Sequence, residues 1–327
     1  MRRTSCAQHL AQLLNVCRTF EKIRLGNSQK VKELQSNMAQ AKTIFLVDDD
    51  EDDFEFMHDA LTEAIEDVRV VQVQNPFHLT QALEANRDGS AKLILLDVNM
   101  PAMNGFELLA SIKHQEHYRP IPVVMVSTTT NQQQVNKAYS MGANAFIVKP
   151  VTMEEYRSMA RGVGLCFLNS YGPACETPPG HKLKIKTIVV VEDNDDYWYL
   201  MNAALKSCMQ QYNIIRIVDT DRMNTFLNHE LHSILPPVDL ILVDLYLPDR
   251  QQGLDLIRQI RSLPGMGGLE NIPVIVFSYS DDPHDIDDAY SSHASAYLIK
   301  PVDLSGWSFY FENLLHFWSD TVRPPRP

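Results

Sequence analysis

Short apolar runs recur along the chain, and each run ends at a polar residue or a turn signal. Residues 93–96 are all apolar and lead directly into Asp97, and Pro101 and Gly105 break the chain soon afterwards. A short apolar run bounded by turn signals is typical of a strand buried on both faces, as in a parallel sheet. Asp97 then has two interpretations: a site residue at the carboxyl end of a strand, or the cap of a turn.

The first half of the chain alternates between strand and helix patterns. Strands are predicted at residues 44–47, 68–73, 93–96, 122–126 and 145–148. Between them, apolar residues recur at helical spacing, as Phe54, Met57 and Leu61 do after the first strand. The alternation of five strands with five helices predicts a doubly wound parallel sheet of the α/β class.

The second half repeats the first. Apolar runs at residues 188–191, 240–243, 273–277 and 296–299 again end at polar residues. The polar residues correspond in kind and order, at offsets of 144 to 151 residues: Asp48 with Glu192, Asp97 with Asp244, Ser127 with Ser278, and Lys149 with Lys300. The chain is therefore predicted to contain two copies of one fold, here called the first repeat (residues 41–170) and the second repeat (residues 184–322). Residues 171–183, rich in glycine and proline, are predicted to link them.

Residues 1–40 precede the repeats and differ from them in charge. Within residues 1–37, seven basic residues stand against two acidic ones, and a helical pattern fades after Leu25. The segment can be a flexible basic extension, a helix that binds a partner, or the product of a start codon assigned too early. We expect a disordered or artefactual segment rather than a functional helix.

The composition excludes several classes of protein. A formal net charge of -12 argues against a nucleic-acid binder, so no DNA partner is expected. The five cysteines are scattered without a CxxC pair, which indicates neither a zinc site nor a disulfide framework and favours the reducing cytoplasm. No apolar run approaches the length needed to cross a bilayer, so membrane insertion is not expected.

The strand ends of each repeat carry an acidic pair, an aspartate, a hydroxyl and a lysine. In a parallel sheet these ends lie at one edge, so the side chains can converge. Three close carboxylates repel one another unless a cation intervenes, and oxygen ligands with open positions suit Mg²⁺. A cation, a lysine and a hydroxyl around an aspartate can trap a phosphoryl group, with Asp97 as the nucleophile. The acidic residues 50–53 are expected to form a solvated first helical turn with no ligand role.

Both repeats resemble the receiver domains of response regulators in bacterial two-component signalling. The resemblance covers residues 41–170 and 184–320 and implies a flavodoxin-like sheet with strand order 2-1-3-4-5. It implies that Asp97 and Asp244 accept the phosphoryl group. It assigns the Mg²⁺ ligands to Asp48, Asp49, Asp97 and Asn99, and to Glu192, Asp193, Asp244 and Tyr246. It assigns the phosphoryl-binding hydroxyl to Ser127 and Ser278, the phosphoryl-binding lysine to Lys149 and Lys300, and the aromatic switch to Phe146 and Tyr297.

The resemblance also implies a function. A sensor histidine kinase or a histidine phosphotransfer protein would donate the phosphoryl group, and the only chemistry would be self-catalysed phosphotransfer and dephosphorylation. There is no room for an output domain after residue 320, so the signal is expected to pass to a downstream protein target by direct contact.

Two alternatives remain open. The first is an aspartate-nucleophile phosphatase of the haloacid-dehalogenase type, which needs a DxDx[TV] pattern on its first strand. Residues 48–52 lack the threonine or valine of that pattern. The second alternative is a scaffold in which the second repeat is inert.

The second repeat departs from the first around its aspartate. Gly253 follows Asp244 by nine residues, whereas Gly105 follows Asp97 by eight. Tyr246 and Tyr279 occupy positions that are usually small or polar in the family, and two tyrosines at the rim would narrow the pocket. We expect the second repeat to be phosphorylated more slowly, or to hold its phosphoryl group longer, than the first.

The last helix of the second repeat carries more aromatic residues than one buried stripe requires. These apolar residues are Trp307, Phe309, Tyr310, Phe311, Leu314, Leu315, Phe317 and Trp318. The surplus predicts a partner surface, either for the first repeat or for a second subunit in a homodimer.

Overall fold

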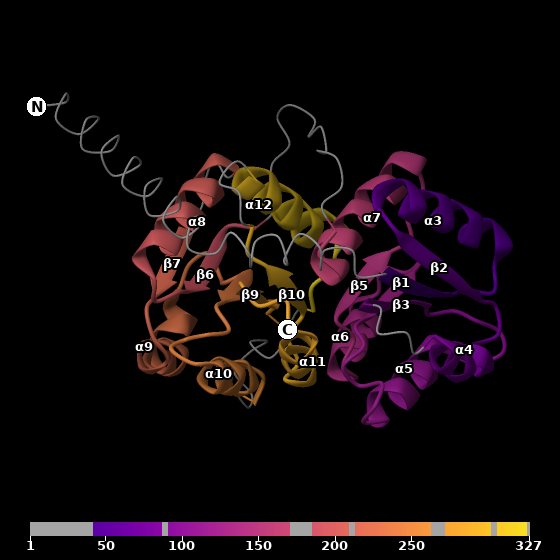
Figure 1. Ribbon diagram of the computed structural model, residues 1–327, viewed down its shortest axis with the longest axis horizontal. Coiled ribbons are helices and arrows are strands. Elements are labelled where there is room, and N and C mark those ends of the chain that lie inside the picture. Colours follow the sequence, from indigo (N-terminus) through magenta and orange to yellow (C-terminus); the bar gives the residue numbers. More distant parts are fainter. Residues whose placement is uncertain are drawn as a thin grey trace, which may run out of the picture. The chain divides into compact units, whose positions relative to one another are not determined.

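The computed structural model describes residues 42–86, 91–170, 185–208, 213–262, 272–301 and 306–325. Within these ranges the chain forms two five-stranded sheets (Figure 1). The basic N-terminal segment and the predicted linker lie outside the described residues. Among the residues described, no helix is both long and apolar enough to cross a membrane.

Each repeat alternates strands and helices, as the sequence predicts. The first repeat contains β1 (Lys42–Val47), α3 (Glu51–Ala64), β2 (Val68–Val73), α4 (Leu79–Ala85), β3 (Ala91–Asp97), α5 (Gly105–His114), β4 (Val123–Ser127), α6 (Gln132–Ser140), β5 (Ala145–Val148) and α7 (Met153–Leu168). The second contains β6 (Thr187–Val191), α8 (Asp195–Cys208), β7 (Asn213–Ile217), α9 (Thr220–Thr225), β8 (Leu240–Val243), α10 (Arg250–Ser262), β9 (Val274–Ser278), α11 (Pro283–Ser291), β10 (Ala296–Ile299), α12 (Gly306–His316) and a π-helical turn, η5 (Phe317–Thr321).

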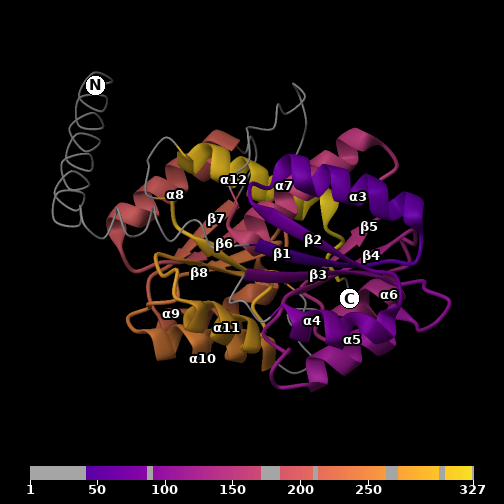
Figure 2. The same cartoon turned by 45° about the vertical axis from the view of Figure 1, so that its right-hand side comes forward.

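Both sheets are parallel and share one strand order. The order β2-β1-β3-β4-β5 in the first repeat matches β7-β6-β8-β9-β10 in the second, which confirms two flavodoxin-like folds in tandem. Helices α3 and α7 cover one face of the first sheet, and α4, α5 and α6 cover the other (Figure 2). Because helices cover both faces, the middle of each central strand is apolar, and residues 93–96 have no exposed surface.

Strand register places the polar strand ends at one edge of each sheet. Val47 pairs with Leu96, so the residues that follow them, Asp48 and Asp97, emerge together. On the other side of β3, Asp97 pairs with Val126, and Ser127 of β4 pairs with Val148 of β5. Asp48, Asp97, Ser127 and Lys149 therefore lie at the same edge of the sheet.

The edge strand β7 has no clear signal in the sequence. Its residues 213–217 are half-buried except for the last, and Arg216 interrupts the apolar run. An edge strand buries less of its surface than a central one. The periodic pattern that marks the other strands is correspondingly weak here.

The last helical segment packs partly on its own sheet and partly on the first repeat. Inside the second repeat, the Phe277 ring lies 5.5 Å from each of three rings of α12, those of Trp307, Tyr310 and Phe311. The Phe311 ring also contacts the rings of Trp307 and Tyr310. Phe317 turns the other way and lies 6.2 Å from the Phe167 ring of α7. This contact agrees with the expectation that the aromatic surplus meets the first repeat.

Helix α7 is buried along almost its whole second half because both repeats pack on it. A Cβ atom built on Gly162 would lie 2.1 Å from the Phe317 ring, so the approach of Phe317 requires glycine there. The C-terminal chain then runs antiparallel to β5: Ile147 bridges Val322, and the Arg323 amide donates to the Phe146 carbonyl at 2.8 Å. The α7 and β5 side of the first repeat is therefore covered by the second.

Candidate functional site

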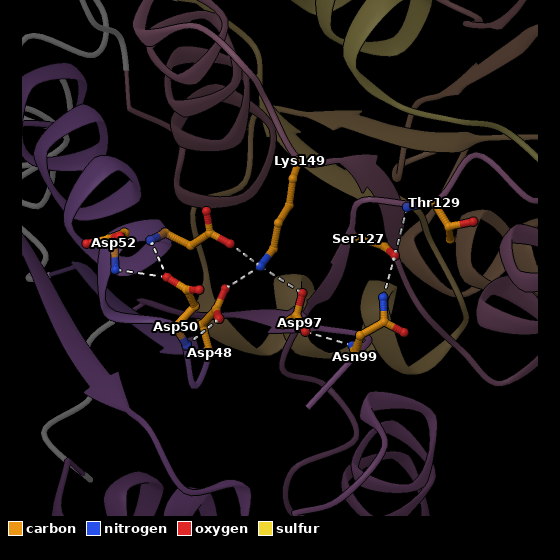
Figure 3. Close-up of polar contacts among 9 residues, drawn as sticks. Asp48, Asp50, Asp52, Asp97, Asn99, Ser127, Thr129 and Lys149 are labelled. Atoms are coloured by element: carbon orange, nitrogen blue, oxygen red, sulfur yellow. Dashed lines mark hydrogen bonds and ion pairs between the residues drawn. The ribbon is translucent and has the colours of Figure 1, made fainter. Parts of the chain in front are cut away.

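The lysine at the end of β5 joins three carboxylates in the first repeat. The Nζ atom of Lys149 lies 3.0 Å from Asp97, 2.9 Å from Asp48 and 2.6 Å from Asp53 (Figure 3). The side chains of Asp48 and Asp97 are only 5% exposed, so these charges interact through a poorly solvated space. The cluster is held by long-range contacts between strand ends.

Local hydrogen bonds orient the carboxylates of the first repeat. The Asp50 amide donates to Asp48, and the Asp50 carboxylate caps α3 by accepting from the amides of residues 52 and 53. That first turn carries Asp53 toward Lys149. On the neighbouring strand, the Asn99 amide donates to the second oxygen of Asp97 at 2.7 Å. One Asp97 oxygen thus faces Lys149 and the other is held by its own loop.

The hydroxyl group predicted for the site lies on the other side of Asp97. Ser127 is fully buried at the end of β4, and its Oγ atom accepts from the Thr129 amide at 3.3 Å. The Asn99 side-chain amide reaches the same oxygen at 3.5 Å (Figure 3). Asn99 therefore connects the acidic side of the site with the hydroxyl side.

The second repeat brings together the corresponding residues, but it encloses its lysine. Lys300 Nζ lies 2.7 Å from Glu192 and 2.8 Å from Asp244, and its side chain has no exposed surface. The Nζ atom also lies 4.9 Å from the Tyr197 ring and 5.3 Å from the Tyr279 ring, within reach of cation–π attraction. The two tyrosine rings lie 4.8 Å apart. We call Tyr197 and Tyr279 the aromatic cap.

Comparison with known proteins identifies this arrangement. The family model for the response regulator receiver domain matches residues 44–161 and 188–306. The chain belongs to the response regulator receiver family.

Individual relatives match one receiver at a time. A probable methanogenesis regulatory protein, FilR2 of Methanothrix harundinacea, is 34% identical over 86 residues, 25% of this chain and 56% of the relative. Response regulator Rcp1 of Synechocystis is 29% identical over 126 residues, 37% of this chain and 86% of Rcp1. The crystal structure of the phosphorylated cyanobacterial phytochrome response regulator RcpA shares 30% identity and a TM-score of 0.37, covering 41% of this chain and 99% of that one. The chain thus spans about half the length of FilR2 and most of Rcp1.

Each receiver carries an acidic triad that fits Mg²⁺. The triads are Asp48, Asp49 and Asp97, and Glu192, Asp193 and Asp244; within each, one oxygen per residue lies within 4.8 Å of the others. All the donors are oxygens, and Asp49 and Asp193 are exposed, so solvent can reach the position where a hydrated cation would bind. Such triads are typical of the Mg²⁺ sites of receivers.

Burial and charge set the protonation of both sites. Burial raises the pKa of Asp48 above its ordinary value, and hydrogen bonding to Lys149 partly opposes that rise. Burial also raises the pKa of Glu192. Burial alone would lower the pKa of Lys149, but its hydrogen bonds to Asp53 and Asp48 hold it above the usual range, so it stays a cation. Each receiver therefore keeps an ammonium group beside the aspartate that ends or follows its third strand, Asp97 or Asp244.

The aromatic switch candidates are both buried. Phe146 of β5 and Tyr297 of β10 have no exposed surface. The Tyr297 hydroxyl donates to the Ser280 carbonyl at 2.9 Å, which ties this ring to the loop that follows Ser278. The structure thus places both rings inward.

One contact corrects an expectation from sequence. Asp53, assigned to a solvated turn, instead forms the shortest of the three ion pairs of Lys149. The Tyr246 hydroxyl donates to Asp285 of α11 at 2.8 Å. Tyr197, which the sequence patterns do not reveal, lies over Lys300 with Tyr279. The useful signal was the repeat itself: an offset of 144 aligns Tyr197 with Asp53.

Proposed function

We propose that this protein is a two-receiver response regulator whose first receiver accepts a phosphoryl group on Asp97 from a phosphohistidine. The observation that carries the proposal is the contact of Lys149 with Asp97 beside the acidic triad and Ser127. The family suggests a sensor histidine kinase or a histidine phosphotransfer protein as the donor, and a downstream protein as the target. Membership of the receiver family also removes the main reason to favour a haloacid-dehalogenase-type phosphatase.

The transfer needs little covalent chemistry from the protein. An Asp97 oxygen attacks phosphorus in line, the new O–P bond forms as the P–N bond to the donor imidazole breaks, and the imidazole leaves. Lys149 can move from the carboxylates to a phosphoryl oxygen, and the Ser127 hydroxyl can donate to another. Mg²⁺ held by Asp48, Asp49, Asp97 and the Asn99 carbonyl would neutralise charge on the phosphoryl oxygens.

Direct labelling tests this function. The full chain is incubated with acetyl phosphate and Mg²⁺, and phosphorylation of each aspartate is quantified by mass spectrometry of its peptides. We expect label on Asp97, slower labelling of Asp244, and none at either residue when EDTA removes the metal. Absence of label on Asp97 with Mg²⁺ present would refute the proposed function, and label on Asp97 alone would favour an inert second receiver.

We further infer that the aromatic cap slows the second receiver. Lys300 must leave the two rings to meet a phosphoryl oxygen, and the rings also restrict access of the donor. The double substitution Tyr197→Ala with Tyr279→Thr removes both rings, and threonine is the residue at the matching position of the first receiver, Thr128. Because releasing a desolvated cation–π contact costs about 1–2 kcal/mol, we expect labelling of Asp244 to accelerate about tenfold.

The matched control for the cap is Tyr199→Phe. Tyr199 lies on α8 like Tyr197 but belongs neither to the cap nor to the acidic triad, so the labelling rate of Asp244 is expected to stay unchanged. Labelling of Asp97 in the same sample reports that the donor and metal are active. The cap hypothesis fails if wild-type Asp244 is labelled as fast as Asp97, or if the double variant gains nothing.

A further inference from the structure

A cavity of about 890 Å³ lies between the two receivers, away from both acidic triads. Its walls come from α5, α6 and the loop before β5 in the first receiver, and from α10, α11 and the loop before β10 in the second. Six basic or histidine side chains line it: Lys113, His114, Arg119, Lys137, Arg261 and His293. Among the described residues that line it there is no aspartate or glutamate, although the whole chain has a net charge of -12.

Two of these cations are fixed at equivalent places in the two receivers. Lys113, near the end of α5, donates to the carbonyls of Arg119 and Ile121 at 3.1 and 2.8 Å. Arg261, near the end of α10, donates to the carbonyls of Ile272 and His293 at 2.7 and 2.9 Å. These acceptors are neutral oxygens, and the bonds position the two side chains. Both receivers therefore present a basic group to the same space.

The cations act on one another across the cavity. Burial lowers the pKa of His293, and the charges of Arg261, Lys113 and Arg119 lower it further. Burial lowers the pKa of Lys113 to about 7, and the charge of Arg119 adds to this effect. Like charges held together in a partly desolvated space are unfavourable unless an anion joins them.

A cross-receiver contact fixes the walls. The side-chain amide of Asn144 donates to the Ala294 carbonyl at 3.1 Å, and this bond is buried. The side-chain oxygen of Asn144 also accepts hydrogen bonds from the Val123 amide at 2.9 Å and from Lys113 Nζ at 3.3 Å. The cationic groups of the two receivers are thus joined through one hydrogen-bonded network.

We propose that this cavity binds a small molecule that carries two or more linked phosphoryl groups. Several cations converge there, so a ligand with several negative charges suits the cavity better than a single phosphate or carboxylate. Arginine and lysine are the side chains that bind phosphoryl oxygens most strongly. The volume is within the range of small-molecule sites, about 300–1,000 Å³. The site is independent of the acceptor aspartates and does not rest on their phosphorylation.

Isothermal titration calorimetry tests the proposal on the full chain in EDTA and low salt. The probes are sodium tripolyphosphate, which offers phosphoryl groups alone, and GTP, which adds a nucleoside. The test variant is Arg119→Glu, because this side chain is exposed and lines the cavity. We expect wild-type binding that weakens as salt is added, and at least about tenfold weaker binding by the variant.

Arg258→Glu is the matched control. Arg258 is an exposed arginine of α10 that pairs with Asp255 and does not line the cavity, so its reversal should leave the dissociation constant unchanged. A second variant, Lys113→Gln, keeps a hydrogen-bond donor but cannot carry a positive charge beside a bound anion, so it should also weaken binding. Thermal unfolding of each variant verifies folding.

Each outcome has a defined meaning. Equal binding of both probes supports recognition of phosphoryl groups alone, and tighter binding of GTP supports a nucleotide. The proposal is overturned if neither probe binds at millimolar concentration, or if the cavity variants and the control bind alike.

Discussion

Asp97→Asn is expected to reduce phosphorylation of the first receiver to background while leaving Asp244 labelled at its wild-type rate. An amide is not a nucleophile toward phosphorus, so no acyl phosphate can form at position 97. The second receiver has its own triad and its own lysine, which the substitution does not touch. Peptide mass spectrometry after incubation with acetyl phosphate and Mg²⁺ measures both sites in one sample.

The same variant is not expected to be less stable. The Asp97 charge is one of the causes that raise the pKa of Asp48, so the two carboxylates repel each other in the folded protein. Asparagine has the same shape, can still accept from the Asn99 amide, and leaves Lys149 with Asp48 and Asp53 as partners. The free energy of unfolding should therefore stay the same or rise, as is common when a functional charge is removed.

Asp52→Asn is the control for this experiment. It removes one negative charge from the exposed first turn of α3, where the side chain does not contact Lys149. In this variant, Asp97 should be labelled at the wild-type rate. Label retained at position 97 of Asp97→Asn, or equal loss in both variants, would contradict the assigned acceptor.

Gly105→Ala should destabilise the first receiver by about 3 kcal/mol or more, at the upper end of the cost of overpacking. A Cβ atom at this position would lie 2.2 Å from the backbone oxygen of Asp97 and 2.9 Å from the Cα atom of Val98. Both neighbours are backbone at the end of β3, so neither can rotate away. Urea unfolding followed by circular dichroism measures the loss, and the labelling rate of Asp97 should fall because its loop must shift.

Gly306→Ala provides the comparison. A Cβ atom at Gly306 would be 3.8 Å from Pro301, an ordinary contact, so alanine should be neutral or stabilise by up to about 1 kcal/mol. If Gly105→Ala unfolds at the same urea concentration as Gly306→Ala, the close approach of α5 to β3 is not required.

A similar close contact between a glycine and the backbone that follows the third strand explains the longer loop of the second receiver. A Cβ atom at Gly253 would lie 1.9 Å from the backbone oxygen of Leu245, the residue after Asp244. Gly105 stands eight residues after Asp97, and Gly253 stands eight residues after Leu245. The extra residue thus moves the contact one position beyond the aspartate. Sequence spacing detected the difference, and only the structure locates the contact.

The sequence by itself determined which residues stand at the strand ends. A strand buried on both faces must be apolar, so its first polar residue marks the place where it emerges. Since parallel strands end at one edge, Asp48, Asp97, Ser127 and Lys149 could be grouped before any coordinates were known. The duplication made the grouping secure, because chance does not preserve the kind and order of four strand-end residues twice.

Tertiary structure alone decided where the side chains point and what the two receivers form together. Asp53 and Tyr197 occupy aligned positions, yet one pairs with a lysine and the other lies over it. Tyr246 turns to Asp285, and the cationic cavity needs walls from both receivers. These outcomes depend on packing between residues far apart in the chain. Periodicity reports only which face of an element is buried, so it cannot specify those contacts.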